Sequence, residues 1–384
     1  MPHPYSAAGA APVAETVIAL RDIAVEYDGF TALQISSFDI QSSEVLALIG
    51  PNGAGKSTLL RIAGLLQYPS AGKVYFRNEQ VNRKNSMGFR RRVASVFQEP
   101  LLLNTSVYDN AALGLRLRGL DRAKIERLLR PWLDRLGIGH LASRPVRTLS
   151  GGEAQRTSLA RAFVLEPEVL LLDEPFSPLD SLSRESLLDD LQRILRETRI
   201  TTVFVTHDRH EAFAMANRVG VLHEGKLVQL GPAADVFAHP LTEQVADTVG
   251  IENRISGLVE SIDGGIATVR IEEGKVQAKA VSAPGSRVIL CVRSEHVQVS
   301  CLDKQFGSAN AVNELKAKVT RVTPGMTHWR LTLRCGKTVL FARIDPNSLI
   351  GFDPREGEEV VVRLDPRTIH VIGPSDAPTS GMAP

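Results

Sequence analysis

A glycine-rich loop near residue 50 has the spacing that phosphate binding requires. The segment reads LIGPNGAGKSTLLRIAGL, from Leu48 to Leu65, with an expected strand before the loop and an expected helix after it. Glycines let successive backbone N–H groups point into one concavity, a lysine can reach the outer phosphates of a nucleotide, and a serine hydroxyl can ligate Mg²⁺. The predicted binding residues are Gly50, Pro51, Asn52, Gly53, Ala54, Gly55, Lys56, Ser57 and Thr58. The loop predicts nucleotide binding without indicating which function the nucleotide serves.

Two adjacent carboxylates follow a buried apolar strand in the segment EVLLLDEPFSPLD, Glu168 to Asp180. Carboxylates in this position lie at the carboxyl edge of a sheet, where open α/β folds bind their ligands. We expect Asp173 to hold Mg²⁺ through its water shell and Glu174 to polarise the attacking water as a general base. The structural alternative is a charged pair that does no more than end a strand.

A second cradle for an anion is predicted in the segment TLSGGEAQRTSLARAFVLEP, Thr148 to Pro167. Ser150, Gly151 and Gly152 come directly before a helical pattern, so backbone N–H groups at the helix N-terminus can meet a phosphate. One nucleotide does not need two such cradles on one subunit. We therefore expect this cradle to serve a nucleotide that is held by another copy of the chain.

Alternating strand and helix patterns surround these motifs and predict a mostly parallel α/β sheet. Short apolar runs such as EVLALIG fit buried parallel strands, and the residues from Lys56 to Ala63 fit a helix. RVGVLHEGKLVQLG, which starts at Arg218, is expected as one strand. A helical stretch from Ser106 to Leu136 belongs to an inserted helical lobe at about residues 100–160.

The chain changes character near Pro240, beyond which its apolar runs are short, rich in Val and Ile, and broken by Gly, Pro or Asp. This composition predicts an all-β module at residues 251–384, behind a first domain at residues 16–250. Residues 1–15 are expected to form a disordered tail.

The β-module carries a weak internal repeat. RVILCVRSEHVQV, from Arg287, matches EVVVRLDPRTIHV, from Glu359, in its apolar positions, and a similar run precedes each copy. Two related small barrels, or one barrel split between the two copies, are expected from this pattern, although shared β-strand composition could produce it by chance.

Composition limits the class of protein. The chain has 45 Lys and Arg against 43 Asp and Glu, and the net charge of +2 argues against a dedicated nucleic-acid binder. No apolar run reaches the roughly 18 residues of a membrane span, and the N-terminus is not expected to be a secretion signal.

The cysteines and histidines do not suggest a metal site. The three cysteines, Cys291, Cys301 and Cys335, are an odd number without metal-type spacing, which fits a reducing cytosol. His207 and His210 have no second pair of ligands nearby, so zinc is not expected.

Taken together, the motifs resemble those of the ATP-binding cassette (ABC) ATPases. GPNGAGKST, FQEP, LSGGEAQR, LLLDEPFSPLD and VTHD occur in the order and approximate spacing of that family, across about residues 16–235. The resemblance implies an α/β P-loop NTPase fold, with a mostly parallel sheet and a helical subdomain, followed by a small all-β OB-like domain. It also implies ATP and Mg²⁺ as ligands, and a head-to-tail dimer in which ATP is sandwiched between the phosphate loop and the signature motif.

The same resemblance assigns roles to four further residues. Gln98 corresponds to the Q-loop glutamine that touches Mg²⁺ and the attacking water, and His207 to the switch histidine that contacts the γ-phosphate. Asp180 ends the D-loop, which communicates across the dimer. Tyr27 resembles the aromatic residue that stacks on adenine, with simple packing as the alternative. The expected catalytic residues are Glu174, His207 and Gln98, and the expected metal ligands are Ser57, Gln98 and Asp173.

Glu153 departs from the family pattern, because the commoner form of the signature motif has Gln at this position. The contacts of Ser150 and the two glycines are expected to survive this change. The carboxylate of Glu153 adds a negative charge close to the triphosphate, so the catalytic rate is harder to infer than the binding mode.

Two classes of function remain open for such a cassette. The first is the motor of an importer, at the cytoplasmic face of the membrane, working on separate transmembrane permease subunits and indirectly on an extracytoplasmic solute-binding protein. The second is a soluble ABC protein of repair or translation type, although those usually carry two cassettes or a long coiled-coil insertion. The β-module resembles the TOBE or MOP-like domain of importers, and the segments FQEPLLLNTSVYDN and LCVRSEHVQVS resemble the molybdate and tungstate branch.

In that branch the C-terminal module can itself bind oxyanion and slow transport, which implies a regulatory role here. Sulfate, ferric iron, polyamine and sugar remain alternative solutes.

Overall fold

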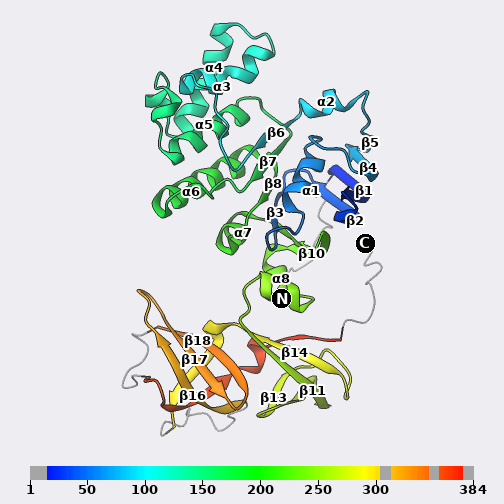
Figure 1. Cartoon of the computed structure of the whole chain (residues 1–384), viewed down its shortest axis with the longest axis vertical. Helices are drawn as coiled ribbons and strands as arrows, with labels where there is room; N and C mark the ends of the chain where they lie inside the picture. Colours follow the sequence, from blue (N-terminus) through cyan, green and yellow to red (C-terminus); the bar gives the residue numbers. More distant parts are fainter. Residues whose placement is uncertain (1–14, 303–312, 346–353, 375–384) are drawn as a thin grey trace, which may run out of the picture. The chain divides into compact units, whose positions relative to one another are not determined.

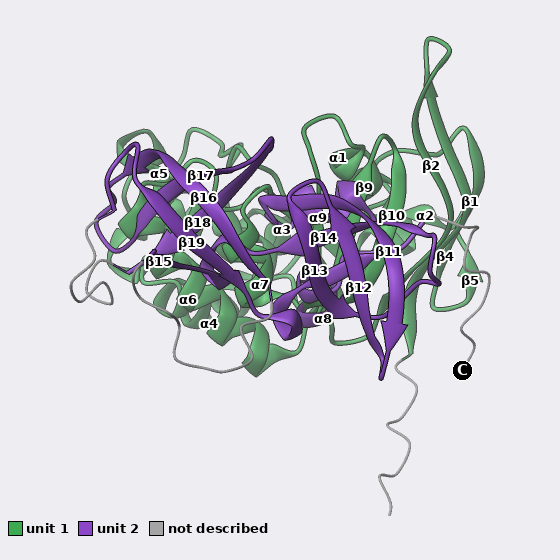
Figure 2. Cartoon of the chain, turned by 90° about the horizontal axis from the view of Figure 1, so that it is seen from below, with its two compact units in different colours: residues 1–233 green, residues 234–384 purple. Residues whose placement is uncertain are grey.

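The computed structural model describes residues 15–302, 313–345 and 354–374. It divides the chain into two compact units, residues 1–233 and residues 234–384, which are coloured separately in Figure 2. The division falls at Ala233, whereas the sequence suggested a boundary at residue 250, and that boundary stays a prediction. The tail expected at residues 1–15 lies outside the described residues, apart from Glu15.

A six-stranded sheet forms the centre of the first unit, in the order β10-β9-β3-β8-β7-β6 (Figure 1). Its strands are β3 (Val45–Ile49), β6 (Val93–Val96), β7 (Val169–Asp173), β8 (Thr201–Val205), β9 (Arg218–His223) and β10 (Lys226–Pro232). All neighbours from β9 to β6 pair in parallel, and β10 pairs with β9 in antiparallel fashion. Leu46, Leu48 and Leu170 are fully buried, as expected for strands covered on both faces. The mostly parallel sheet predicted from the sequence is therefore confirmed.

The run RVGVLHEGKLVQLG forms two strands, so the expectation of a single strand was wrong. β9 and β10 are joined at Glu224 and Gly225, whose φ angles are +48° and +73°. Two consecutive residues with positive φ form the tight turn that suits the twist of a hairpin. A Cβ at Gly225 would also lie 2.9 Å from the carbonyl oxygen of Ala32, so the turn needs a glycine here.

An antiparallel sheet in the order β2-β1-β4-β5 completes the β structure of the first unit. Its strands are β1 (Thr16–Tyr27), β2 (Phe30–Gln41), β4 (Ala71–Phe76) and β5 (Glu79–Gln80). Side chains from both sheets share one apolar core, in which Phe38 and Ile40 of β2 lie in the same cluster as Leu46 and Leu48 of β3.

Helices follow most of the parallel strands. They are α1 (Lys56–Ala63), α2 (Ser86–Arg90), α3 (Val107–Leu117), α4 (Arg122–Arg135), η1 (Gly139–Leu141), η2 (Val146–Thr148), α5 (Gly151–Phe163), α6 (Ser181–Thr198), α7 (Arg209–Met215), α8 (Ala233–Ala238) and α9 (Glu243–Thr248). The helical stretch expected from Ser106 to Leu136 is two helices, because Gly119 takes a φ of +78° and Asp121 caps a new helix. In the part of the chain that the structure describes, no helix is both long and apolar enough to cross a membrane.

A helical lobe is formed by α3, α4 and α5 at the β6 edge of the sheet (Figure 1). Its interior contains the stacked rings of Trp132 on α4 and Phe163 on α5, with centroids 4.9 Å apart. Ser106 and Asp121 begin α3 and α4 as N-caps, each accepting a hydrogen bond from a backbone N–H. The inserted helical lobe predicted near residues 100–160 is present.

Two five-stranded antiparallel sheets form the second unit, in the orders β13-β12-β11-β14-β20 and β15-β19-β16-β17-β18. The elements are β11 (Asn253–Asp263), β12 (Ile266–Ile271), β13 (Gly274–Lys279), β14 (Arg287–Val292), η3 (Ser294–His296), β15 (Val297–Cys301), β16 (Glu314–Thr323), β17 (Trp329–Cys335), β18 (Thr338–Ile344), β19 (Glu359–Leu364), η5 (Pro366–Thr368) and β20 (His370–Ile372). One apolar cluster includes residues of both sheets. Cys291, Cys301 and Cys335 lie in β14, β15 and β17, and none of them forms a disulfide within the described residues.

Each half of the second unit gives its last strand to the sheet of the other half. β15 follows β14 in the chain but pairs with β19, and β20 follows β19 but pairs with β14. The repeat seen in the sequence places β14 in correspondence with β19 and β15 with β20. The two halves therefore exchange a strand, and the choice between two small barrels and one split barrel stays a prediction.

Two buried asparagines tie the two sheets together at equivalent places. The Asn253 side chain donates to the carbonyl oxygens of Val292 (3.1 Å) and Phe341 (2.9 Å), on β14 and β18. The Asn313 side chain donates to the carbonyl oxygens of Gln277 (2.8 Å) and Leu364 (3.0 Å), on β13 and β19. Because each amide also accepts a backbone N–H from the opposite sheet, its hydrogen-bonding capacity is well satisfied.

Candidate nucleotide-binding site

The phosphate loop lies between the central strand β3 and helix α1. Gly50 has a φ of +149°, and a Cβ there would lie 2.1 Å from the carbonyl oxygen of Leu222. Gly55, the N-cap of α1, has a φ of +95°, and its Cβ would lie 3.0 Å from the carbonyl oxygen of Ala32. Both positions exclude a side chain, so the glycine spacing is a requirement of how the loop packs against β2 and β9 as well as of anion binding.

Lys56 is directed into its own loop. Its Nζ donates to the carbonyl oxygens of Gly50 and Pro51, both at 2.9 Å, and the side chain is almost fully buried. Burial lowers the pKa of Lys56, while the nearby Glu174 and Asp173 act in the opposite direction. A cation that is partly desolvated inside a ring of backbone groups can exchange those carbonyl contacts for phosphate oxygens.

Ser57 and Asp173 meet although they lie far apart in the sequence. The hydroxyl of Ser57, at the start of α1, donates to Oδ1 of Asp173, at the end of β7, over 3.1 Å. Burial raises the pKa of Asp173, and the neighbouring carboxylate of Glu174 raises it further, while Ser57 opposes this. A hydroxyl beside a half-buried carboxylate supplies the oxygen ligands that Mg²⁺ prefers.

Glu174 and His207 also lie together. Nδ1 of His207 is 3.1 Å from Oε2 of Glu174. Glu174 follows β7 with a φ of +45°, and its backbone N–H donates to the carbonyl oxygen of Val205 at the end of β8 (3.0 Å). A positive φ is unfavourable for a residue with a side chain, and such strain is typical of functional sites. The structure thus joins the predicted base and the predicted switch histidine across two adjacent parallel strands.

Gln98 and Tyr27 make contacts that the sequence did not suggest. The Gln98 amide, after β6, donates to the Ser177 hydroxyl over 3.2 Å, and no hydrogen bond connects it to the Ser57–Asp173 pair. The Tyr27 hydroxyl, at the end of β1, accepts from the Gln67 amide over 2.6 Å, and its ring is 45% exposed. The exposed ring is available for stacking, and the metal contact expected for Gln98 stays a prediction.

The signature segment begins α5 with a capping box. The Ser150 hydroxyl accepts from the N–H of Glu153 (3.3 Å), and the Glu153 carboxylate accepts from the N–H of Ser150 (2.7 Å). This backbone hydrogen bond lowers the pKa of Glu153, so the residue is ionised at neutral pH. Arg144 lies 3.6 Å from the same carboxylate and offsets part of its charge. The Ser-x-x-Glu spacing of Ser150 and Glu153 is the sequence signature of a capping box, and it could have predicted this position of Glu153. The contact with Arg144 has no such signal.

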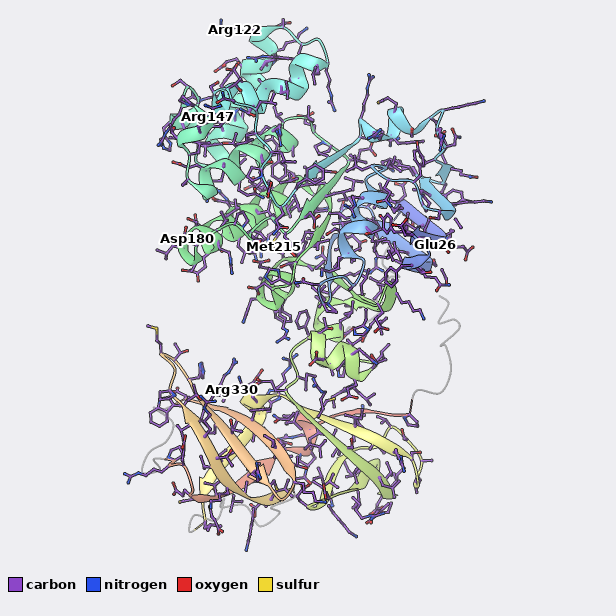
Figure 3. All side chains as sticks on the ribbon, viewed as in Figure 1. Glu26, Arg122, Arg147, Asp180, Met215 and Arg330 are labelled. Carbon is purple, nitrogen blue, oxygen red and sulfur yellow. The ribbon has the colours of Figure 1, made fainter. Side chains whose placement is uncertain are left out.

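The two predicted phosphate cradles are not connected within one chain. Among the described residues, no hydrogen bond or ion pair joins residues 50–58 to residues 150–153. Asp180, labelled in Figure 3, is exposed and caps α6 by accepting from the N–H of Ser183 (3.0 Å). Hydrogen bonds with the side chain and then the backbone of Ser183 lower the pKa of Asp180. A Cβ at Gly151 would lie 3.1 Å from the carbonyl oxygen of Pro178, so the start of α5 packs closely against the D-loop.

A buried carboxylate behind His207 escaped the sequence analysis. Glu211 on α7 accepts a short hydrogen bond from Thr206, which directly precedes His207. Thr206 in turn accepts from the N–H of Asp208 (2.9 Å), and Arg184 in the first turn of α6 lies 3.9 Å from the Glu211 carboxylate. Burial raises the pKa of Glu211. These contacts support the turn that carries His207, and only the tertiary structure could reveal them.

A phosphate loop after a central parallel strand, two carboxylates at the edge of that sheet and a helical lobe with a capped second cradle define an ATP-binding cassette. Family models agree: residues 33–177 match "ABC transporter" and residues 290–372 match "TOBE domain". The chain belongs to the ABC transporter family, as one of its ATP-hydrolysing subunits.

Relatives match along nearly the whole chain. The molybdate/tungstate import ATP-binding protein WtpC of Pyrococcus horikoshii is 34% identical over 359 residues, covering 92% of this chain and 99% of that protein. The spermidine/putrescine import ATP-binding protein PotA of Borreliella afzelii is 31% identical over 364 residues, covering 93% and 98%. Among solved structures, the dimeric, post-hydrolysis ATP-binding cassette MJ0796, bound to ADP and Pi, has a TM-score of 0.52 at 27% identity, covering 56% of this chain and 98% of that one.

Proposed function

We propose that this chain hydrolyses ATP to drive the import of molybdate or tungstate. The observation that carries the proposal is the end-to-end match to a molybdate/tungstate import ATP-binding protein, which includes both the cassette and the β-module. The geometry of the nucleotide site supports the ATPase part of the proposal. Import of a polyamine is the second candidate, because a relative of that name also matches end to end.

Glu174 is the proposed general base. Its carboxylate takes the proton of the attacking water, whose oxygen forms a bond to the γ-phosphorus as the bond to the ADP oxygen breaks. An ionised carboxylate can only accept, so the 3.1 Å contact with His207 places a proton on Nδ1 of the histidine and fixes its ring. The other edge of the ring is then available to the γ-phosphate.

Mg²⁺ fits beside Ser57 and Asp173, whose oxygens lie 3.1 Å apart at the end of the sheet. When bound, the ion would neutralise charge on the β- and γ-phosphates. Lys56 would bind the same phosphates from the loop, and Tyr27 would stack on the adenine. Gln98 would join the metal site only after releasing Ser177.

A dimer is part of the proposal. Ser150, Gly151, Gly152 and Glu153 present a helix N-terminus that makes no polar contact with the phosphate loop of the same chain, and the solved cassette described above is dimeric. A second copy would bring this cradle to the γ-phosphate of the ATP bound by the first copy, with Asp180 near the dimer interface. Closing on ATP and opening after hydrolysis would then act as a mechanical switch.

The remaining partners follow from the importer class. Separate permease subunits would receive the motion at the cytoplasmic face of the membrane, where the chain would be a peripheral subunit, and a solute-binding protein would deliver the oxyanion. The β-module, taken as residues 251–384, would serve as the regulatory domain.

Uptake by cells that lack the gene tests the solute directly. Uptake of labelled molybdate and tungstate should fall, while uptake of labelled spermidine and sulfate should not. Loss of spermidine uptake alone would favour the second candidate.

A further inference from the structure

A pocket of about 700 Å³ opens within the second unit and takes no part in the nucleotide site. Its wall combines the end of β13, the turn after β14 and the segment from η5 to β20, with the residue that follows α8. The strand exchange builds this pocket, because β20 comes from one half of the unit and the other strands come from the other half. Its volume lies in the range of small-molecule sites, about 300–1,000 Å³.

Apart from Thr368 and the thiol of Cys291, the polar side chains around the pocket are those of lysine, arginine and histidine. They are Lys279, Arg293, Arg367, His239, His296 and His370. Among the residues that the structure describes, no Asp or Glu lines this pocket. The permanent charges among these side chains are those of Lys279, Arg293 and Arg367, and a concave surface with charges of one sign concentrates ligands of the opposite sign.

Two of these groups are held in place by the surrounding backbone. The Arg293 guanidinium donates to the carbonyl oxygen of Phe237 over 2.7 Å, and Nε2 of His370 donates to the carbonyl oxygen of Pro240 over 2.8 Å. Burial lowers the pKa of His370, which keeps this ring neutral and structural. The ring of His239 stands edge-on to His370, with centroids 5.5 Å apart. The rim is therefore positioned before any ligand arrives.

Charge remains available at the mouth of the pocket. Arg367 already forms a double hydrogen bond with Asp365, at 3.1 and 2.7 Å, so half of its capacity is used. Lys279 and His296 have no ion-pair partner within the described part of the chain, and both are exposed. These two side chains are the groups that an added anion would contact at least cost, because no existing pair must be broken.

The rest of the wall is apolar. Val281 and Ile266 are 54% and 39% exposed, and the buried side chain of Ile251 also lines the pocket. Exposed branched aliphatic side chains inside a concavity gain free energy when an apolar body covers them. A lone tetrahedral oxyanion would leave most of this wall and volume unused.

We propose that this pocket binds a small organic anion, in which a carboxylate or phosphate group is joined to an apolar body. The anionic group lies between Lys279 and His296, and the apolar body lies against Val281 and Ile266. The proposal does not rest on the solute that the transporter carries, nor on ATP hydrolysis.

Calorimetric titration of the full chain, saturated with ADP to block the phosphate loop, tests the site with four probes. Phenyl phosphate and benzoate carry both features, phenol carries only the ring, and inorganic phosphate carries only the charge. The proposal is supported if phenyl phosphate or benzoate binds more tightly than both phenol and inorganic phosphate. The tighter of the two organic anions then shows whether the site prefers a phosphate or a carboxylate. Absence of binding by both organic anions, or equal binding by inorganic phosphate, overturns it.

Two single substitutions test whether the probe binds in this pocket. Lys279→Ala should weaken binding of the better probe by about 3- to 5-fold, as one exposed ion pair provides. Lys275→Ala is the matched control, because Lys275 lies on the same strand, pairs with Glu260 outside the pocket and should leave binding unchanged. Both side chains are exposed, so neither variant should alter folding. Equal binding by Lys279→Ala and the wild type, or equal losses in both variants, would contradict the assignment.

Discussion

Nδ1 of His207 lies 3.1 Å from Oε2 of Glu174, and this contact joins the ends of two adjacent parallel strands. Neither residue can take its proposed role alone, since the carboxylate needs an oriented partner and the ring needs a fixed tautomer. The pair lies beside Asp173, so base and metal ligand occupy consecutive positions of one strand end. Our first prediction concerns this pair.

Glu174→Gln should reduce ATP hydrolysis by about 10²- to 10⁴-fold, the usual contribution of a general base, while ATP still binds. The amide keeps the size of the side chain and a contact with His207, so an ATP-bound dimer should accumulate. Phosphate release and gel filtration with ATP measure the two effects. Glu185→Gln, on the exposed side of α6, is the control. A monomer-only elution profile with ATP would count against the sandwich dimer.

Lys56→Ala should weaken ATP binding by at least about tenfold, because a buried charge-assisted contact to phosphate contributes roughly 1.5–3 kcal/mol. Its Nζ already points at the loop carbonyls of Gly50 and Pro51, where the phosphates would enter. Titration with a fluorescent ATP analogue checks this, with the exposed Lys73→Ala as control. Unchanged affinity would remove the phosphate loop from the nucleotide site.

Glu153→Gln should keep the N-cap of α5, because the amide oxygen can accept from Ser150 as the carboxylate does. It should also strengthen the ATP-dependent dimer at low salt, since it removes a negative charge beside the triphosphate, and the gain should shrink as salt screens that charge. Glu153→Ala keeps the Ser150 cap but loses the hydrogen bond that the Glu153 carboxylate accepts from the Ser150 N–H, and should cost about 1 kcal/mol of stability. Analytical ultracentrifugation at two salt concentrations measures dimerisation. A weaker dimer in Glu153→Gln would show that Glu153 makes a favourable contact across the dimer.

Glu211 predicts a pH dependence of stability. Burial raises its pKa in the folded chain above the unfolded value, so the folded state retains the proton to higher pH. The stability associated with the neutral form is present below the unfolded pKa and is lost as pH rises through the folded pKa. Glu211→Gln, which stays neutral, should therefore gain in Tm over the wild type as pH increases. A difference in Tm that is constant from acidic to alkaline pH would contradict this.

Asn253→Ala and Asn313→Ala should each destabilise the second unit by about 2–4 kcal/mol, because each leaves buried backbone groups without partners in both sheets. Trp329 lies in this unit and Trp132 in the other, so urea unfolding followed by fluorescence in a Trp132→Phe background reports on the β-module. Gln298→Ala, at an exposed position of β15, is the control. A loss as small as that of the control would mean that the asparagines do not hold the sheets together.

The local parts of the nucleotide site could be predicted from the sequence because their physical requirements are local. Gly50, Gly55 and Lys56 lie within one short loop, and backbone conformation and helix start are fixed by neighbours in the chain. For the same reason the bounds predicted for α1 and the capping position of Ser150 were right. The hairpin at Glu224 and the break at Gly119 were missed, although Gly225 is a turn signal and Gly119 with Asp121 carries the signals of a helix end and a new helix start.

Relationships across the fold were decided only by tertiary structure. Ser57 meets Asp173 across 116 positions of sequence because β3 and β7 are parallel strands that end at the same edge of a sheet. The hydrogen bond from Gln98 to Ser177 and the contacts of Glu211 behind His207 depend on side-chain packing. Such packing leaves no periodic pattern in the sequence. In the β-module, the sequence revealed a repeat but not which half pairs with β15 and β20. That pairing is a contact between segments far apart in the chain, and it brings the segment from η5 to β20 to the wall of the pocket.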